Sequence, residues 1–320
     1  MRASLANHFG RELQLGTAMW AENTARPGYY TGNPVLSLVV SQFMTSLKRR
    51  KVRAGETVVS ARAMGASTLR KMVELNSSFV DPPAGSNPRK RGQPDDDPSR
   101  WATRSTRLTL NLVYLVSFLC LLRFEEALRI QWHWITLEGP DEYGEYRLRI
   151  DLPFRKTHQT GDIAPFYLYE NFEQPWLDPV LAYCTLVEDM AQYGLPLQGF
   201  VCRKRMNSGS MSADETAEMT SASFLSCLRS NLLEVHIDPT PYGTHSFRRG
   251  GCQYLAIECR WSIRQICAWG SWTDSQESST VFKYLLSFVD EVDDRENYFS
   301  KRRKAGGQKC LYCGRSCRCA

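Results

Sequence analysis

The sequence predicts a mostly α-helical protein with two domains, the larger of which also contains a small antiparallel sheet. Apolar residues recur at helical spacing, and Asn-Pro or Asp-Pro pairs mark where several of these segments begin. Two stretches, 146–152 and 163–169, flank a turn that contains glycine, which predicts a β-hairpin. Residues 81–100 combine Pro, Gly, Ser and charges of both signs, so we expect a linker between the domains there.

The composition favours a globular, non-membrane protein. The 320 residues are 42% hydrophobic and 23% charged, which is enough for two domains with their own cores. The longest apolar run, 110–122, is too short to span a bilayer and is interrupted by Asn111 and Ser117, so we expect a buried helix. We find no secretory signal pattern, and 11 cysteines in that setting favour reduced thiols in the cytosol or nucleus.

We expect two helices in the small domain, at residues 1–80. The first begins at Asn33-Pro34 and the second covers about 57–75. Residues 1–100 hold 15 Lys and Arg against 8 Asp and Glu, whereas residues 101–320 hold 25 against 26. A basic domain joined to a nearly neutral one fits a polyanion partner, although a solvated basic surface gives the same pattern. The expected phosphate contacts close the first helix: Lys48, Arg49, Arg50, Lys51 and Arg53.

In the larger domain, 101–299, we expect one long helix before the hairpin and several helices after it. A long helix over 101–122 is followed by the hairpin, and Asp178-Pro179 starts a helix within 176–193. The other expected elements are a short strand at 200–202 and helices at 221–235, from Thr244 onward, at 262–269 and at 280–288. The basic, cysteine-rich tail covers 300–320.

One stretch, 242–256, carries an unusual group of polar residues and glycines. His245 and Arg248 stand three residues apart at the start of a helix, so both side chains can reach one phosphate. Gly250 and Gly251 each destabilise a helix by about 1 kcal/mol relative to alanine, which indicates that another segment passes very close to them. An ordinary helix start with a surface His and Arg is the alternative.

Other residues extend this pair into a recurrent pattern. Arg123 closes the long helix and Glu126 follows it, Lys156 lies near the hairpin tip, and Trp272 and Tyr284 come after the His-x-x-Arg helix. In this order and spacing the residues resemble the tyrosine recombinase (phage integrase) family. The sequence segments GTHSFRRGG and WGSW are most similar to those of Crypton-type recombinases of eukaryotic mobile elements.

The resemblance implies DNA strand cleavage and rejoining through a covalent 3′-phosphotyrosyl intermediate, without a cofactor. Two guanidiniums and a histidine would stabilise the transition state, and a lysine would protonate the leaving oxygen. The resemblance also implies double-stranded DNA as partner and a tetramer on two duplexes. The predicted catalytic residues are Arg123, Lys156, His245, Arg248, Trp272 and Tyr284, with Glu126 orienting a neighbouring cation.

Several alternatives stay open at this stage. Tyr298 is the second choice of nucleophile, because the gap between Trp272 and Tyr284 is longer than the family's. A catalytically inactive, recombinase-derived DNA-binding protein and a topoisomerase of the same chemistry are rival functions. The small domain also shows fewer helices than the family has, so a truncated DNA-binding domain is kept as a further alternative.

The tail carries four cysteines and a basic run. No metal site is expected, because the C-x3-C-x-C spacing is tight for one tetrahedral ion and the tail lacks histidine. A zinc site at Cys310, Cys313, Cys317 and Cys319 is kept as the alternative to free thiols. The basic run at 300–304 fits nuclear import, so we expect a nuclear protein, or a cytoplasmic one if the source is prokaryotic.

Overall fold

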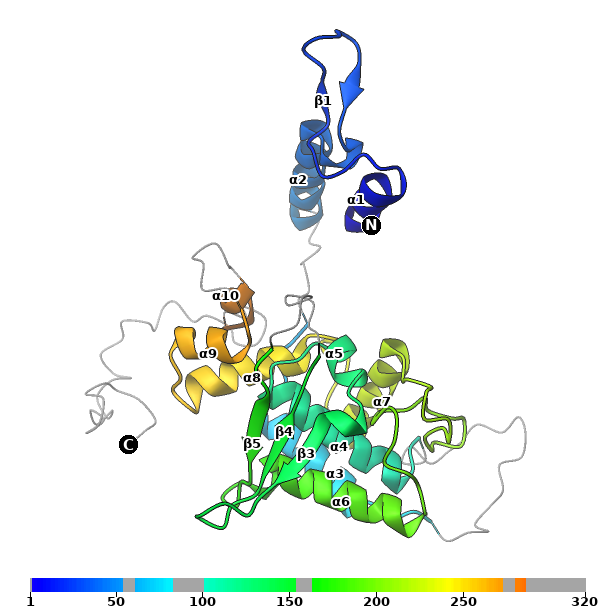
Figure 1. Cartoon of the computed structure of the whole chain (residues 1–320), viewed down its shortest axis with the longest axis vertical. Coiled ribbons are helices and arrows are strands. Elements are labelled where there is room, and N and C mark those ends of the chain that lie inside the picture. The colour runs from blue at the N-terminus through cyan, green and yellow to red at the C-terminus, as the bar shows by residue number, and fades with distance from the viewer. Residues whose placement is uncertain (1, 54–60, 83–100, 154–162, 273–279, 286–320) are drawn as a thin grey trace, which may run out of the picture. The chain divides into compact units, whose positions relative to one another are not determined.

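The computed structural model describes residues 2–53, 61–82, 101–153, 163–272 and 280–285 (Figure 1). The chain divides into two compact units, Met1–Val59 and Ser60–Ala320. The division therefore falls near the start of the range expected for the second helix, 57–75, and before the observed helix at 66–78, instead of at 81–100. The reason is that α3 (Ala66–Ser78) packs against α4 (Arg104–Leu119) and contributes Leu69 and Met72 to the core of the larger unit.

The N-terminal unit is held together around Asn33. Its side-chain amide donates to the carbonyl of Ala6 at 2.9 Å, and its side-chain oxygen accepts from the N–H of Val35 at 3.1 Å. Asn33 caps a 3-10 turn that begins at Pro34, whereas the α-helix expected to begin there starts only at Leu38. The elements are α1 (Arg2–Asn7), η1 (His8–Glu12), β1 (Ala21–Glu22), β2 (Tyr30–Thr31), η2 (Pro34–Leu36) and α2 (Leu38–Arg53).

The predicted basic cluster lies on the last turns of α2. The helix ends at Arg53, and the side chains of Arg49 and Arg50 are exposed. Arg50 also lies 5.8 Å from the ring of Phe43, measured from its guanidinium carbon to the ring centroid. Exposed cations at a helix C-terminus fit phosphate binding and helix-dipole stabilisation equally well, so the DNA contact stays a prediction.

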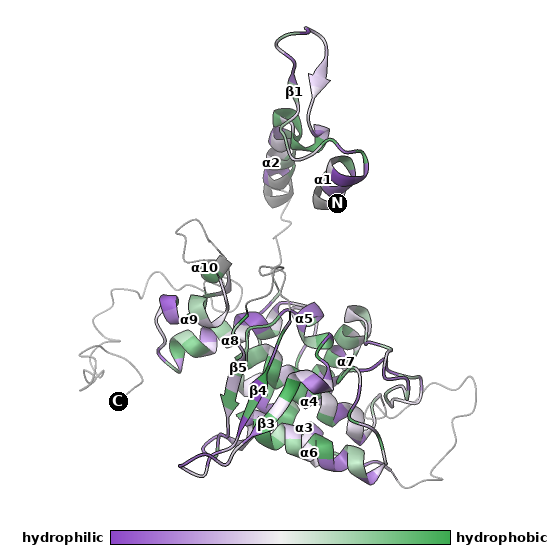
Figure 2. Cartoon of the chain, in the orientation of Figure 1, coloured by the Kyte–Doolittle hydropathy of each residue, from purple (hydrophilic) through white to green (hydrophobic). Residues whose placement is uncertain are grey.

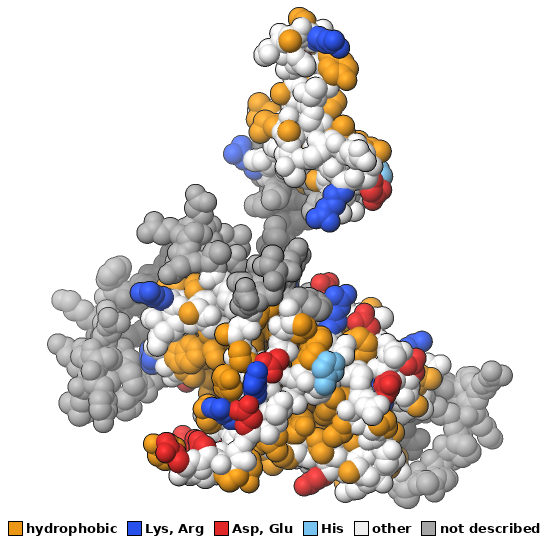
Figure 3. All heavy atoms as spheres, in the orientation of Figure 1, with side chains coloured by type: hydrophobic (Ala, Val, Ile, Leu, Met, Phe, Trp, Pro, Cys, Tyr) orange, Lys and Arg blue, Asp and Glu red, His pale blue; other side chains and the backbone are white. Residues whose placement is uncertain are grey.

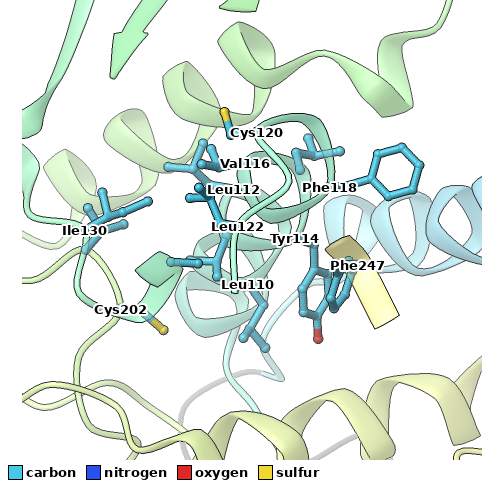
Figure 4. Packing of buried hydrophobic residues seen from close by; sticks show 14 of the residues in the cluster. Leu110, Leu112, Tyr114, Val116, Phe118, Cys120, Leu122, Ile130, Cys202 and Phe247 are labelled. Atoms are coloured by element: carbon cyan, nitrogen blue, oxygen red, sulfur yellow. The ribbon is translucent and has the colours of Figure 1, made fainter. Parts of the chain in front are cut away.

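The larger unit is built around α4, which is buried on every side from Thr106 to Phe118. This confirms the buried helix expected from the apolar run. Figure 4 shows the core packing, in which the rings of Tyr114 and Phe247 stack at a centroid distance of 4.8 Å. The remaining helices are α3, α5 (Phe124–Leu128), α6 (Pro179–Gln192), α7 (Ser221–Glu234), α8 (Ser246–Ile257), α9 (Ile263–Trp269) and α10 (Thr280–Leu285), with 3-10 turns η3 (Trp132–Trp134) and η4 (Pro175–Leu177).

The predicted hairpin is present and gains a third strand. Strands β3 (Ile135–Glu138), β4 (Arg147–Ile150) and β5 (Phe166–Tyr169) form an antiparallel sheet in that order. Alternate residues of β4 and β5 are buried, and the turn between β3 and β4 is hydrophilic (Figure 2). On the face seen in Figure 3, acidic and basic side chains lie side by side over the sheet, where Arg147 pairs with Glu138 at 2.8 Å.

A buried polar cluster ties three helices together. Arg107 of α4 donates to the carboxylate of Glu234 at 2.7 and 2.8 Å and to the side-chain oxygen of Asn76 at 3.2 Å. Asn76 also donates to the side-chain oxygens of Asn111 and Asn231, at 2.8 and 3.0 Å. These bonds satisfy polar groups that burial would otherwise leave unpaired, and they fix α3 and α7 on α4.

Most of the other expected elements are observed. The helices at 176–193, 221–235 and 262–269 are present as α6, α7 and α9, whereas the short strand at 200–202 is only a single bridge between Gln131 and Phe200. Within the described ranges, no helix combines the length and apolar composition needed to cross a membrane. The seven cysteines of the described ranges have free thiols.

Candidate active site

The His-x-x-Arg pair stands at the start of α8. His245 is the residue before the first helical turn and is exposed, whereas Arg248 is only 1% exposed. The helix begins at Ser246, later than the expected cap at Thr244. The Ser246 hydroxyl accepts from the N–H of Gly243 at 2.9 Å, so the turn before the helix is closed by that bond. The two functional side chains still begin the same helix.

Both glycines of α8 are required by close packing, as the sequence predicts. A Cβ added to Gly250 would lie 2.0 Å from the carbonyl oxygen of Met64. A Cβ added to Gly251 would lie 2.0 Å from the carbonyl oxygen of Phe118, on α4. These distances are far below van der Waals contact, so α8 can rest on its two neighbours only with glycine at both positions.

Glu126 connects the two predicted catalytic arginines. Its carboxylate accepts from the Arg123 guanidinium at 3.0 Å and from the Arg123 backbone N–H at 2.9 Å. The same carboxylate also faces Arg248, whose Nη1 lies 3.6 Å from Glu126 Oε2. One carboxylate thus holds two guanidiniums close together, which agrees with the orienting role expected for Glu126.

Trp272 and Tyr284 cover the same guanidinium. The guanidinium carbon of Arg248 lies 4.6 Å from the Trp272 ring and 5.4 Å from the Tyr284 ring. The Tyr284 ring is 5.6 Å from Trp272 and 6.3 Å from His245, measured between centroids. Tyr284 reaches this position because α10 packs on α8, where Gln253 donates to the Tyr284 carbonyl at 3.2 Å.

The electrostatics of the site favour a neutral histidine. Although the His245 side chain is exposed at the surface, its neighbours remove part of its hydration, which lowers its pKa, and the nearby cations Arg248, Arg123 and Arg249 lower it further. A neutral imidazole can accept a proton at neutral pH. The indole N–H of Trp272 is buried and has no hydrogen-bond partner among the described residues, which leaves a donor available to a ligand.

Five predicted residues therefore come together: Arg123, Glu126, Arg248, Trp272 and Tyr284, with His245 beside the Tyr284 ring. Lys156 and Tyr298 lie outside the described residues, as do Cys310, Cys313, Cys317 and Cys319. Within the described ranges, no group of three or more metal-ligating side chains occurs. Sequence reasoning missed Arg249, whose only signal is its place beside Arg248.

Comparison with known proteins gives only distant structural similarity, with TM-scores below 0.5. No protein-family model and no curated protein matches the chain. Among solved structures it is similar to the XerH site-specific recombinase bound to difH substrate, in post-cleavage and pre-cleavage complexes, with 15% identity and TM-scores of 0.42 and 0.40. These matches cover 70% and 71% of this chain but 50% and 51% of the XerH chains.

A third similar structure is a Flpe mutant in a DNA Holliday junction complex, with 13% identity and a TM-score of 0.34, covering 81% of this chain and 57% of that one. The chain thus spans about half the length of the XerH structures that it matches. Similarity at this level does not assign an activity, so the function depends on the chemistry of the site.

Proposed function

We propose that the protein cuts and rejoins DNA strands, with Tyr284 as the nucleophile. The observation that carries this proposal is the convergence of Arg123, Arg248, Trp272 and Tyr284 with His245 beside them, from segments far apart in the sequence. The sequence resemblance to tyrosine recombinases predicted this group of residues, and their proximity supports it.

The chemistry follows from the charges and protons at the site. The Tyr284 hydroxyl oxygen attacks the scissile phosphorus, a Tyr–O–P bond forms, and the bond from phosphorus to the 5′ oxygen breaks. Neutral His245 accepts the tyrosine proton. Arg123 and Arg248 stabilise the negative charge that gathers on the non-bridging oxygens, and the Trp272 indole N–H is a third donor to them.

The leaving oxygen also needs a proton. Lys156 lies in the chain between β4 and β5, and the family resemblance assigns it the role of general acid. Rejoining reverses the sequence of bonds, since a 5′-hydroxyl from another strand attacks the phosphotyrosyl phosphorus and releases Tyr284. The phosphodiester energy is kept in the covalent intermediate throughout.

The finer assignments are part of the same proposal. We infer a Crypton-type recombinase of a mobile element, acting on double-stranded DNA as a tetramer in the nucleus. The N-terminal unit would bind the DNA backbone through the basic end of α2, where Arg49 and Arg50 are exposed.

The rival function is a recombinase-derived protein that binds DNA without cutting it. The distinguishing experiment is a suicide-substrate assay, in which nicked DNA duplexes trap the covalent intermediate. A protein–DNA adduct that survives denaturant and is absent in Tyr284→Phe would support the enzyme. Tyr298→Phe is the matched control and should still form the adduct; loss in Tyr298→Phe alone would move the nucleophile. DNA binding without any adduct would favour the rival.

A further inference from the structure

The start of α8 rests on a segment from a distant part of the chain. This anchor segment, residues 61–64, runs beside the turn that leads into the helix. The N–H of Arg62 donates to the carbonyl of Pro241 at 2.7 Å, and the N–H of Met64 donates to the carbonyl of Ser246 at 2.9 Å. Met64 is fully buried. The anchor segment therefore supports the backbone on both sides of His245.

Arg249 of α8 also holds the anchor segment, through its side chain. Its side chain is almost fully buried, and its Nη1 donates to the carbonyl of Ala61. The next residue, Gly250, sits directly on the Met64 carbonyl, so the helix meets the segment at both ends. A buried cation held by a backbone carbonyl is costly to displace, because its charge would lose that compensation.

We propose that Arg249 is a positioning residue, which holds α8 on the anchor segment so that His245 and Arg248 present their side chains to the scissile phosphate. This inference depends on the proposed cleavage activity. Arg249 itself, with its guanidinium committed to Ala61, does not touch the substrate.

The first test is independent of activity. Arg249→Gln should speed hydrogen exchange at the amides of Arg62 and Met64 and shift the His245 ring resonances, while amides of α4 keep their protection. Arg249→Lys should retain most of the protection because a cation can still reach the carbonyl. Arg229→Gln, which removes an exposed arginine of α7, is the matched control and should change neither.

Charge removal alone would shift a histidine resonance, so a second variant keeps every charge. Gly250→Ala places a methyl group against the Met64 carbonyl and should reproduce both the faster exchange and the His245 shift. Unchanged exchange and His245 resonances in Arg249→Gln and Gly250→Ala would overturn the proposal, whether or not the wild type cleaves DNA.

The second test measures the reaction. In single-turnover assays on nicked DNA, Arg249→Gln should lower the rate of adduct formation by about tenfold or more, since small misplacements of catalytic groups have effects of that size. The Kd for DNA should stay unchanged, and Arg249→Lys should recover most of the rate. Faster exchange with an unchanged rate would overturn the positioning role. Absence of any wild-type adduct would instead refute the proposed function. The exchange and resonance data would still show whether Arg249 holds α8 on the anchor segment.

Discussion

Replacement of Arg107 should remove a large part of the stability of the larger unit. Arg107→Met keeps an apolar stem but leaves the Glu234 carboxylate, whose side chain is 9% exposed, without its two charge-assisted hydrogen bonds. The substitution also removes the stacking of the guanidinium on Phe79 and Trp101, at 4.0 and 4.7 Å. Breaking a buried ion pair from one side typically lowers the free energy of unfolding by about 3–5 kcal/mol. That is a large part of the total free energy of unfolding of a typical protein, which is roughly 5–15 kcal/mol.

Urea unfolding followed by tryptophan fluorescence measures this effect. The double variant Arg107→Met with Glu234→Met should recover most of the loss, because it leaves no unpaired buried charge. The matched control is Arg70→Met, which breaks an exposed Arg70–Glu74 pair of 2.7 Å whose side chains are 59% and 51% exposed. Its effect should stay within about 0.5 kcal/mol. If Arg107→Met lowered the free energy of unfolding by less than about 1 kcal/mol, the reasoning would be refuted, because the buried ion pair would then contribute no more than an exposed one.

Three further predictions concern the site. Glu126→Gln should weaken the link between Arg123 and Arg248 and lower the rate of adduct formation while DNA binding stays as tight or tighter, as gel-shift assays would show; weaker binding would contradict this. An NMR titration of His245 should give a midpoint below the ordinary histidine pKa of about 6.5. Because the folded state resists protonation of His245, the free energy of unfolding should fall as the pH drops through that ordinary pKa. A His245→Gln variant should lack this loss of stability. Trp272→Phe removes an N–H that has no partner among the described residues, so adduct formation should slow more than the loss of packing explains. An unchanged rate would exclude the indole as a donor.

The sequence by itself determined the local elements and the composition of the site. Helical spacing and Asp178-Pro179 predicted α6, whose first turn is closed by an Asp178 oxygen that accepts from Leu181 at 2.9 Å. Alternation predicted β4 and β5 because one face of that sheet is buried. The strand β3 was missed, since its two exposed residues are adjacent and burial does not alternate along it as it does along β4 and β5. Arg123, His245 and Arg248 could be selected as catalytic residues from the sequence, because the resemblance to a family depends on residue types and their order along the chain.

Tertiary structure alone decided which distant segments meet. Residues 66–78 read as part of an N-terminal domain, but α3 belongs to the larger unit because buried Asn76 is bonded to α4 and α7. Sequence spacing could not show that Glu126 lies between two guanidiniums or that Tyr284 reaches Arg248. It also gave no sign that Arg249 holds residues 61–64 beneath His245. Local patterns encode helices and strands, whereas such contacts depend on how buried surfaces and hydrogen bonds are satisfied across the whole unit.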